Sequence, residues 1–163
     1  MSTTTPQLVE QLAERLMEKG WMLATAESCT GGMIAAACTD LAGSSNWFDR
    51  GFVTYSNEAK QDMLGVPQAL IAAHGAVSEP VARAMASGAV AHSGARCGVA
   101  VTGVAGPGGG SEAKPVGTVW FGWHLEGDSP QTHAECLRFD GDRAQVRQAT
   151  VRHALHRLLQ LMA

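Results

Sequence analysis

The chain has 163 residues, of which 45% are hydrophobic and 17% are charged, and its formal net charge is −3. This length suits one domain with its own core, so we expect residues 1–163 to form a single domain and exclude a disordered chain. The acidic balance without a long basic run argues against a nucleic-acid-binding surface, and no apolar run approaches the about 20 residues that span a membrane.

Hydrophobic spacing and the positions of glycine and proline predict the order of the elements. In chain order we expect a helix from Thr5 to Gly20, a strand over 21–25, a helix over 33–40, a strand over 47–55 bent at Gly51 and helices over 58–64 and 67–74. A helix opened by Ser78, strands over 97–102, 117–125 and 132–139, and a helix capped by residues 140–142 and running to Met162 complete the order. The last two strands should pair antiparallel, because the turn between them is too short for a crossover helix. This order predicts an α/β fold, a three-layer α/β/α sandwich with a mixed sheet of about five strands.

The turn over residues 26–32 (A-E-S-C-T-G-G) places Ser28 where a strand ends and a helix begins. Gly31 and Gly32 let the backbone turn closely and leave amide N–H groups free, and such amides can hold an anion or a developing oxyanion. In the alternative interpretation, Ser28 or Thr30 is only a helix cap and the glycines only form the turn.

Lys60 is expected in the first turn of the helix that follows the second strand, where the helix dipole disfavours a cation and lowers the lysine pKa. A neutral lysine can act as a general base. Because Ser28 and Lys60 follow two strand ends that could meet in space, the pattern allows serine–lysine nucleophilic catalysis. Tyr55 closes the preceding strand and could relay the proton or bind the leaving group. The alternative is an exposed lysine on a solvated helix face.

Three further features have two interpretations each. Cys29 is either a rival nucleophile or a small packed residue. The glycine-rich segment over 103–110 is either a nest for phosphate or ribose or a surface loop. Arg143, at the start of the last helix, is either a phosphate clamp or a surface arginine that pairs with Asp140 or Asp142.

Six short motifs, taken together and in this order, resemble those of the CinA C-terminal domain family, the nicotinamide-nucleotide amidases. They are A-E-S-C-T-G-G at 26–32, Y-S-N-E-A-K at 55–60, G-A-V-S-E-P-V at 75–81, T-G-V-A-G-P at 102–107, K-P-V-G-T-V at 114–119 and G-D-R at 141–143. The resemblance covers nearly the whole chain, although the separate N-terminal domain of longer family members has no counterpart in it.

The resemblance implies hydrolysis of the carboxamide of nicotinamide mononucleotide to nicotinate mononucleotide and ammonia, in pyridine nucleotide salvage. It implies Ser28, Lys60 and Tyr55 as catalytic residues and no metal or other cofactor. It also implies a homo-oligomer, which we expect to be a dimer. The substrate contacts that it implies are Glu27, Thr30, Gly31, Gly32, Thr102, Gly103 and Arg143.

Two other functions stay open at this point: a non-catalytic nucleotide-binding module and a cysteine amidase. The N-terminus lacks the basic and apolar regions of a signal peptide. The four cysteines form no C-x-x-C pair and suggest no disulfide framework. We therefore expect a reducing, cytoplasmic setting.

Overall fold

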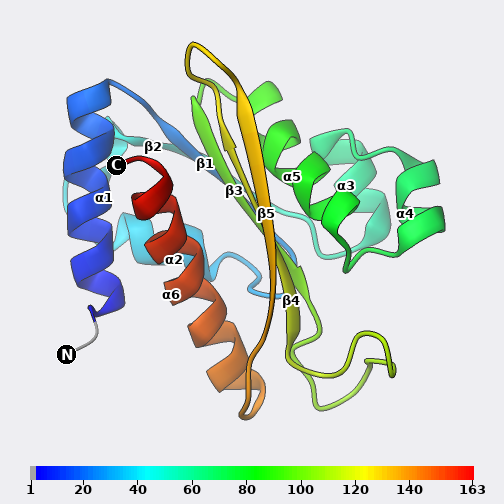
Figure 1. The fold of residues 1–163 in the computed structure, drawn as a ribbon. Coiled ribbons are helices and arrows are strands. Elements are labelled where there is room, and N and C mark those ends of the chain that lie inside the picture. Colours follow the sequence, from blue (N-terminus) through cyan, green and yellow to red (C-terminus); the bar gives the residue numbers. More distant parts are fainter. Residues whose placement is uncertain (1–2) are drawn as a thin grey trace.

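A five-stranded mixed sheet separates two layers of helices (Figure 1). The computed structural model describes residues 3–163. β1 pairs in parallel with β2 and β3, and β4 is antiparallel to β3 and β5. The strand order is β2-β1-β3-β4-β5, with the strands β1 (Leu23–Glu27), β2 (Phe48–Val53), β3 (Cys97–Gly103), β4 (Thr118–Leu125) and β5 (Gln131–Arg138). The predicted α/β/α sandwich, its mixed sheet and its antiparallel final pair of strands are confirmed.

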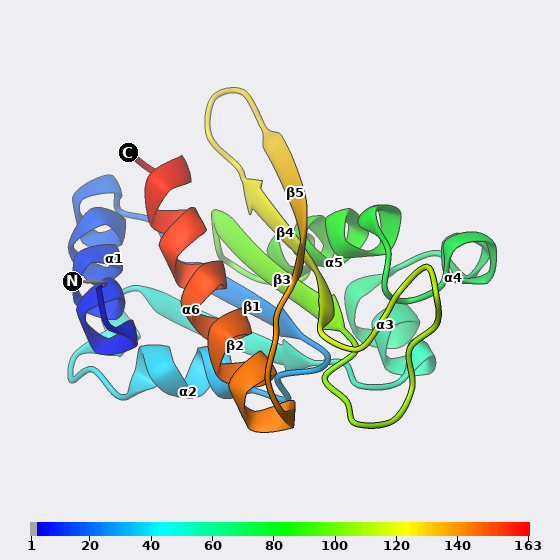
Figure 2. The same cartoon turned by 60° about the horizontal axis from the view of Figure 1, so that its bottom comes forward.

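The helices divide between the two faces of the sheet (Figure 2). One face carries α1 (Thr5–Lys19), α2 (Met33–Thr39) and α6 (Arg143–Leu161), and the other carries α3 (Asn57–Leu64), α4 (Gln68–His74) and α5 (Glu79–Ala91). A short 3₁₀ helix, η1 (Ser44–Asn46), precedes β2. No helix within residues 3–163 is both long enough and apolar enough to cross a membrane.

The side chains of the strands alternate between two hydrophobic cores. Leu23 and Val99 join the core under α1, α2 and α6, whereas Ala24 and Ala100 join the core under α3, α4 and α5. This period of two is what pleated strands impose when both faces of a sheet are covered. All five residues of β1 are buried, as expected of a strand in the middle of the sheet.

Several strand details differ from the prediction. β2 ends at Val53, so Tyr55 follows that strand and does not close it. β1 occupies residues 23–27 rather than 21–25, so its last residue, Glu27, lies directly before Ser28. β2 has a register irregularity at Asp49, since Leu23 pairs with Phe48 and Ala24 with Arg50, and the bend expected at Gly51 stays a prediction. The Asp49 carboxylate accepts the amide N–H of Gly94 at 2.9 Å, and the extra residue on this strand is what defines a β-bulge.

Small residues let α5 lie close to its neighbours. A Cβ at Gly88 would lie 2.2 Å from the Leu64 carbonyl oxygen of α3, and a Cβ at Gly122 would lie 2.3 Å from the Ala82 carbonyl oxygen of α5. Glycine therefore allows β4, α5 and α3 to pack backbone against backbone. This packing sets the position of α3, the helix that carries Lys60.

Candidate active site

The candidate site lies at one edge of the sheet, where three parallel strands end. The turn with Ser28 follows β1, Thr54 and Tyr55 follow β2, and Thr102 and Gly103 end β3. Parallel strands bring their carboxyl ends to the same edge, and in open α/β sheets ligands bind there.

Ser28 and Lys60 are in direct contact. The Lys60 Nζ lies 3.0 Å from the Ser28 Oγ and 2.8 Å from the Thr54 carbonyl oxygen. The Tyr55 carbonyl oxygen is a third neighbour at 3.4 Å. Ser56 caps α3 by accepting the Ala59 amide at 3.0 Å, so Lys60 projects from the first turn of that helix. The structure therefore brings together the serine and the lysine that the sequence placed after neighbouring strands.

The surroundings of Lys60 favour its neutral form. Its side chain is only 1% exposed, and burial lowers the pKa of the ammonium group, with a small opposing effect from Cys29. A neutral amine has two N–H donors and one lone pair. The Thr54 and Tyr55 carbonyls can accept the two donors, which leaves the lone pair facing the Ser28 hydroxyl. This is the arrangement that proton abstraction from a serine requires.

Glu27 and Thr30 face into the protein and hold the turn. Glu27 is 1% exposed, and its carboxylate accepts the Thr30 hydroxyl at 2.5 Å and the amides of Ile34 and Ala35 at 2.8 and 3.0 Å. It thereby caps α2, whose N-cap residue, Gly32, has no side chain to do so. This geometry favours a structural role for both side chains over the substrate contact that the resemblance implied.

The amides of the turn are partly used within it. Gly31 and Gly32 have φ values of +57° and +108°, which explains the need for glycine. The Gly31 N–H donates to the Ser28 carbonyl oxygen at 3.1 Å. Across residues 3–163, the amides of Cys29, Thr30 and Gly32 have no acceptor within the chain. Thr30 is fully buried, so the N–H groups of Cys29 and Gly32 are the candidates for holding an oxyanion.

Tyr55 lies at the rim of the site and not beside the lysine amine. Its side chain is 65% exposed, and its hydroxyl accepts a hydrogen bond from Arg143 Nη2 at 3.4 Å. Arg143 Nη1 donates to the Gly106 carbonyl oxygen at 2.9 Å, which ties the start of α6 to the glycine-rich segment. Asp142, which we considered as a partner for Arg143, instead caps α6 by accepting the Gln145 amide at 2.9 Å.

The end of β3 is packed rather than open. Thr102 is 1% exposed, and its hydroxyl donates to the Ala76 carbonyl oxygen at 3.0 Å. A Cβ at Gly103 would lie 2.8 Å from the Thr118 carbonyl oxygen of the neighbouring strand. Of this pair, only Gly103 is partly exposed, so any contact with a ligand would fall to its backbone.

The sequence interpretation missed Arg147. This residue lies one turn after Arg143 on α6, and its guanidinium donates to two carbonyl oxygens of the Ser28 turn, from Nε to Cys29 at 3.1 Å and from Nη2 to Thr30 at 3.2 Å. In the sequence, Arg147 follows these two partners by 118 and 117 residues. The one available signal was the i, i+4 spacing to Arg143, which places both arginines on one helix face.

Cys29 is a poor nucleophile in this position. Its side chain is 6% exposed and belongs to the core under α1, α2 and α6. Burial raises the pKa of its thiol to about 11, so the thiolate that reacts is scarce at neutral pH. This observation favours Ser28 over the cysteine alternative.

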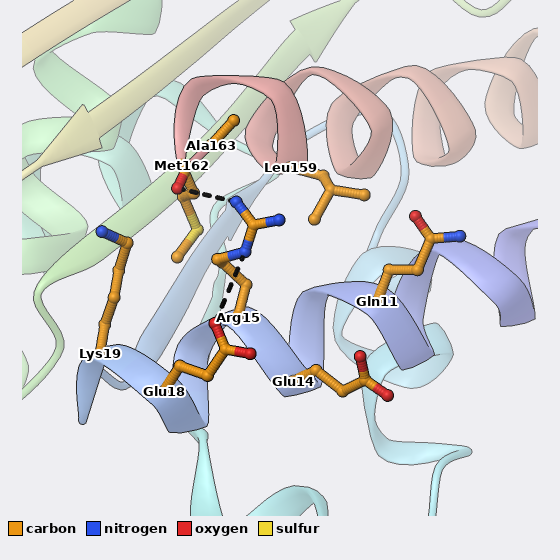
Figure 3. Close-up of a pocket in the computed structure, with 8 residues that line it drawn as sticks. All are labelled: Gln11, Glu14, Arg15, Glu18, Lys19, Leu159, Met162 and Ala163. Carbon is orange, nitrogen blue, oxygen red and sulfur yellow. Dashed lines mark hydrogen bonds and ion pairs between the residues drawn. The ribbon is translucent and has the colours of Figure 1, made fainter.

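A polar hollow of about 420 Å³ lies between the last turns of α1 and α6 (Figure 3). Arg15 crosses it and donates to the Met162 carbonyl oxygen at 3.1 Å. The hollow lies beside the amino end of β1, opposite to the end that carries Ser28 (Figure 1). Its side chains of both charges, including Glu14, Glu18 and Lys19, have no place in the chemistry of Ser28. Within residues 3–163, no three His, Cys, Asp or Glu side chains converge as a metal-binding group.

The fold and the contact between a serine and a buried lysine define an α/β protein with a hydrolase-like site. The chain belongs to the CinA C-terminal domain family, whose sequence model matches residues 5–162. The family predicted from the six motifs is thus confirmed.

Curated relatives share this region at high identity. The nicotinamide-nucleotide amidohydrolase PncC of Escherichia coli K12 is 53% identical over 154 residues, covering 94% of this chain and 92% of that protein. The PncC of Pseudomonas putida is 55% identical over 154 residues, covering 94% of each chain. Among solved structures, the competence/damage inducible protein CihA from Agrobacterium tumefaciens has a TM-score of 0.92 and 46% identity, with complete coverage of both chains.

Proposed function

We propose that this protein is a nicotinamide-nucleotide amidohydrolase. It hydrolyses the carboxamide of nicotinamide mononucleotide to the carboxylate and releases ammonia, a step of pyridine nucleotide salvage. Relatives that are 53% and 55% identical over most of their length carry that name. The structural observation that supports the chemistry is the buried Lys60 amine 3.0 Å from the Ser28 hydroxyl.

In the mechanism that we propose, Ser28 is the nucleophile and Lys60 is the general base. The neutral Lys60 amine takes the proton as the Ser28 oxygen attacks the carboxamide carbon. The resulting oxyanion accepts hydrogen bonds from N–H groups of the turn, and each such donor stabilises a transition state of this kind by a few kcal/mol. Protonated Lys60 then gives its proton to the departing nitrogen, which leaves as ammonia.

The second half of the reaction repeats these roles with water. Lys60, neutral again, takes a proton from a water molecule that attacks the acyl carbon. The bond between that carbon and the Ser28 oxygen breaks, and the proton returns to Ser28. The products are nicotinate mononucleotide and the free enzyme.

The substrate phosphate needs a cationic or amide-rich partner at some distance from the carboxamide. Arg143 supplies a guanidinium at the same edge of the sheet, fixed to the Gly106 carbonyl at 2.9 Å. We assign phosphate binding to Arg143 and the amides of the glycine-rich segment. Tyr55, held by Arg143 at 3.4 Å, is assigned to the substrate rim and not to proton relay, because Lys60 contacts its carbonyl and not its hydroxyl.

The remaining expectations complete the proposal. The scheme uses no cofactor and no metal. All four cysteines are free, which suits a reducing compartment, and we place the enzyme in the cytoplasm. The dimer implied by the resemblance stays a prediction, which light scattering of the purified protein tests.

The deciding experiment is ammonia release from nicotinamide mononucleotide by the wild type, Ser28→Ala and Lys60→Met, with excess chelator and no added metal. Removal of the nucleophile or its base should lower kcat by about 10³-fold or more. Ser45→Ala is the matched control, because Ser45 is exposed in η1, away from the site. Tight nucleotide binding without ammonia release by the wild type would instead support a binding module.

A further inference from the structure

The turn that carries the nucleophile is held from outside by one arginine. Arg147 of α6 donates to the carbonyl oxygens of Cys29 and Thr30 at 3.1 and 3.2 Å, the two residues that follow Ser28. The guanidinium has a rigid fork of donors, so it can fix two carbonyls at once. Two consecutive peptide planes are therefore oriented by a side chain from the far end of the sequence.

Fixing a carbonyl also fixes the amide on the other side of the same peptide plane. Both peptide bonds of Thr30 are trans, and in a trans peptide the N–H points opposite to the C=O. With the Cys29 carbonyl bound to Arg147, the Thr30 N–H points away from α6. With the Thr30 carbonyl bound there as well, the Gly31 N–H points back into the turn and donates to the Ser28 carbonyl at 3.1 Å.

The opposite side of the turn is held by Glu27. Its carboxylate accepts the Thr30 hydroxyl at 2.5 Å, and the Thr30 carbonyl accepts both Arg147 at 3.2 Å and the Met33 amide at 3.1 Å. The Cys29 carbonyl depends on Arg147. Thr30 is fully buried. Of its polar groups, only the N–H lacks a partner within residues 3–163.

We propose that Arg147 is a positioning residue of the amidase reaction, which holds the Cys29 and Thr30 carbonyls so that the turn keeps Ser28 and the free amides of Cys29 and Gly32 in place. The inference rests on the proposed function. Without Arg147 these two carbonyls lose a charged hydrogen-bond partner, and the turn is free to shift. Such a shift misplaces the oxyanion donors, whereas the Lys60 amine on α3 stays where it is.

A rival role for Arg147 is direct binding of the substrate phosphate. The two roles affect different kinetic constants. Loss of an interaction made only in the transition state lowers kcat and leaves KM nearly unchanged, whereas loss of a phosphate ligand raises KM. The same substitution therefore distinguishes a residue that acts through the turn from one that touches the substrate.

The test compares Arg147→Met and Arg147→Lys with Arg152→Met as the matched control. Arg152 lies on the same helix and also donates to a backbone carbonyl, from Nε to Thr3 at 2.9 Å, but it does not contact the Ser28 turn. Arg147→Met should lower kcat for ammonia release by about 10²- to 10³-fold, the loss typical of one oxyanion donor. KM and the Kd of the product nicotinate mononucleotide should stay within about threefold of the wild type. Arg147→Lys should recover part of kcat, because an ammonium can bind one of the two carbonyls.

Three outcomes overturn the inference. In the first, Arg147→Met keeps kcat within about threefold of the wild type. In the second, Arg147→Met raises KM about tenfold with kcat preserved. In the third, Arg152→Met loses kcat as strongly as Arg147→Met does. If Arg147→Met does not fold, the kcat and KM of Arg147→Lys decide in the same way. A wild type without ammonia release, or a fully active Ser28→Ala, overturns the proposed function itself, whereas a fully active Arg147→Met beside an inactive Ser28→Ala overturns only the role of Arg147.

Discussion

Replacing Glu27 by glutamine tests whether this carboxylate holds the active-site turn or contacts the substrate. The carboxylate is 1% exposed and accepts hydrogen bonds from the Thr30 hydroxyl and from the amides of Ile34 and Ala35 at 2.5, 2.8 and 3.0 Å. The amide of Glu27→Gln keeps one acceptor oxygen and replaces the other with a donor. The Thr30 hydroxyl or an amide of α2 then faces the NH₂ group of the glutamine inside the protein, and two donors cannot form a hydrogen bond with each other.

The magnitude follows from these contacts. Hydrogen bonds to a charged group contribute about 1.5–3 kcal/mol each, and an unsatisfied buried donor costs about 1–3 kcal/mol. The negative charge at the start of α2 adds about 0.3–1 kcal/mol. Because glutamine retains part of the bonding, we expect Glu27→Gln to lower the free energy of unfolding by about 2–4 kcal/mol. For a domain of this size that corresponds to a fall in Tm of about 6–12 °C.

The assay is urea denaturation of the wild type, Glu27→Gln and Asp142→Asn. Asp142 is the matched control, since it is an exposed acidic cap that accepts one amide, that of Gln145, at 2.9 Å. Asparagine caps helices as well as aspartate does, so Asp142→Asn should stay within about 0.5 kcal/mol of the wild type. The reasoning is refuted if Glu27→Gln is as stable as Asp142→Asn. An accompanying rise in KM of about tenfold would restore Glu27 as a substrate contact.

Three more predictions follow from the same contacts. Because burial lowers the pKa of Lys60 and the base must be neutral, kcat/KM should rise with pH through that lowered pKa and then level off; a flat rate profile would contradict the role of Lys60 as the base. Urea denaturation of the wild type and Lys60→Met across pH should show the wild type losing relative stability as pH falls through the same pKa. Iodoacetamide at pH 8 should alkylate the exposed Cys136 and leave ammonia release intact, because Cys29 is buried and the pKa of its thiol is about 11. Peptide mass spectrometry locates the adduct, and inactivation that tracks Cys29 labelling would support Cys29 as the nucleophile. Gly88→Ala should lower the free energy of unfolding by about 1–3 kcal/mol, because its Cβ would lie 2.2 Å from the Leu64 carbonyl oxygen; thermal unfolding beside the exposed Gly108→Ala, which has open space around it, measures this.

Features that depend on near neighbours in the chain were accessible from the sequence. The spacing of Leu8, Leu12 and Leu16 predicted α1, and Gly20 ends that helix in a left-handed conformation. Ser56, a residue type that favours helix starts, caps α3, and the short turn after β4 predicted the antiparallel pairing of β5. Hydrophobic periodicity, caps and turn residues act over a few positions, so a single sequence displays them directly.

The arrangement of the candidate site depended on contacts between distant segments. Only the sheet order and the packing of α3 and α6 place Lys60 3.0 Å from Ser28 and Arg147 3.1 Å from the Cys29 carbonyl. The sequence alone left Lys60 as either a base or a solvated side chain, and it contained no sign that Glu27 caps α2. The partners in these two contacts are 32 and 118 residues apart in the sequence, and such contacts form when whole layers pack together. Local spacing therefore determined which helices and strands form, and tertiary packing decided which side chains meet, because the free energy of those contacts exists only once the sheet is covered on both faces.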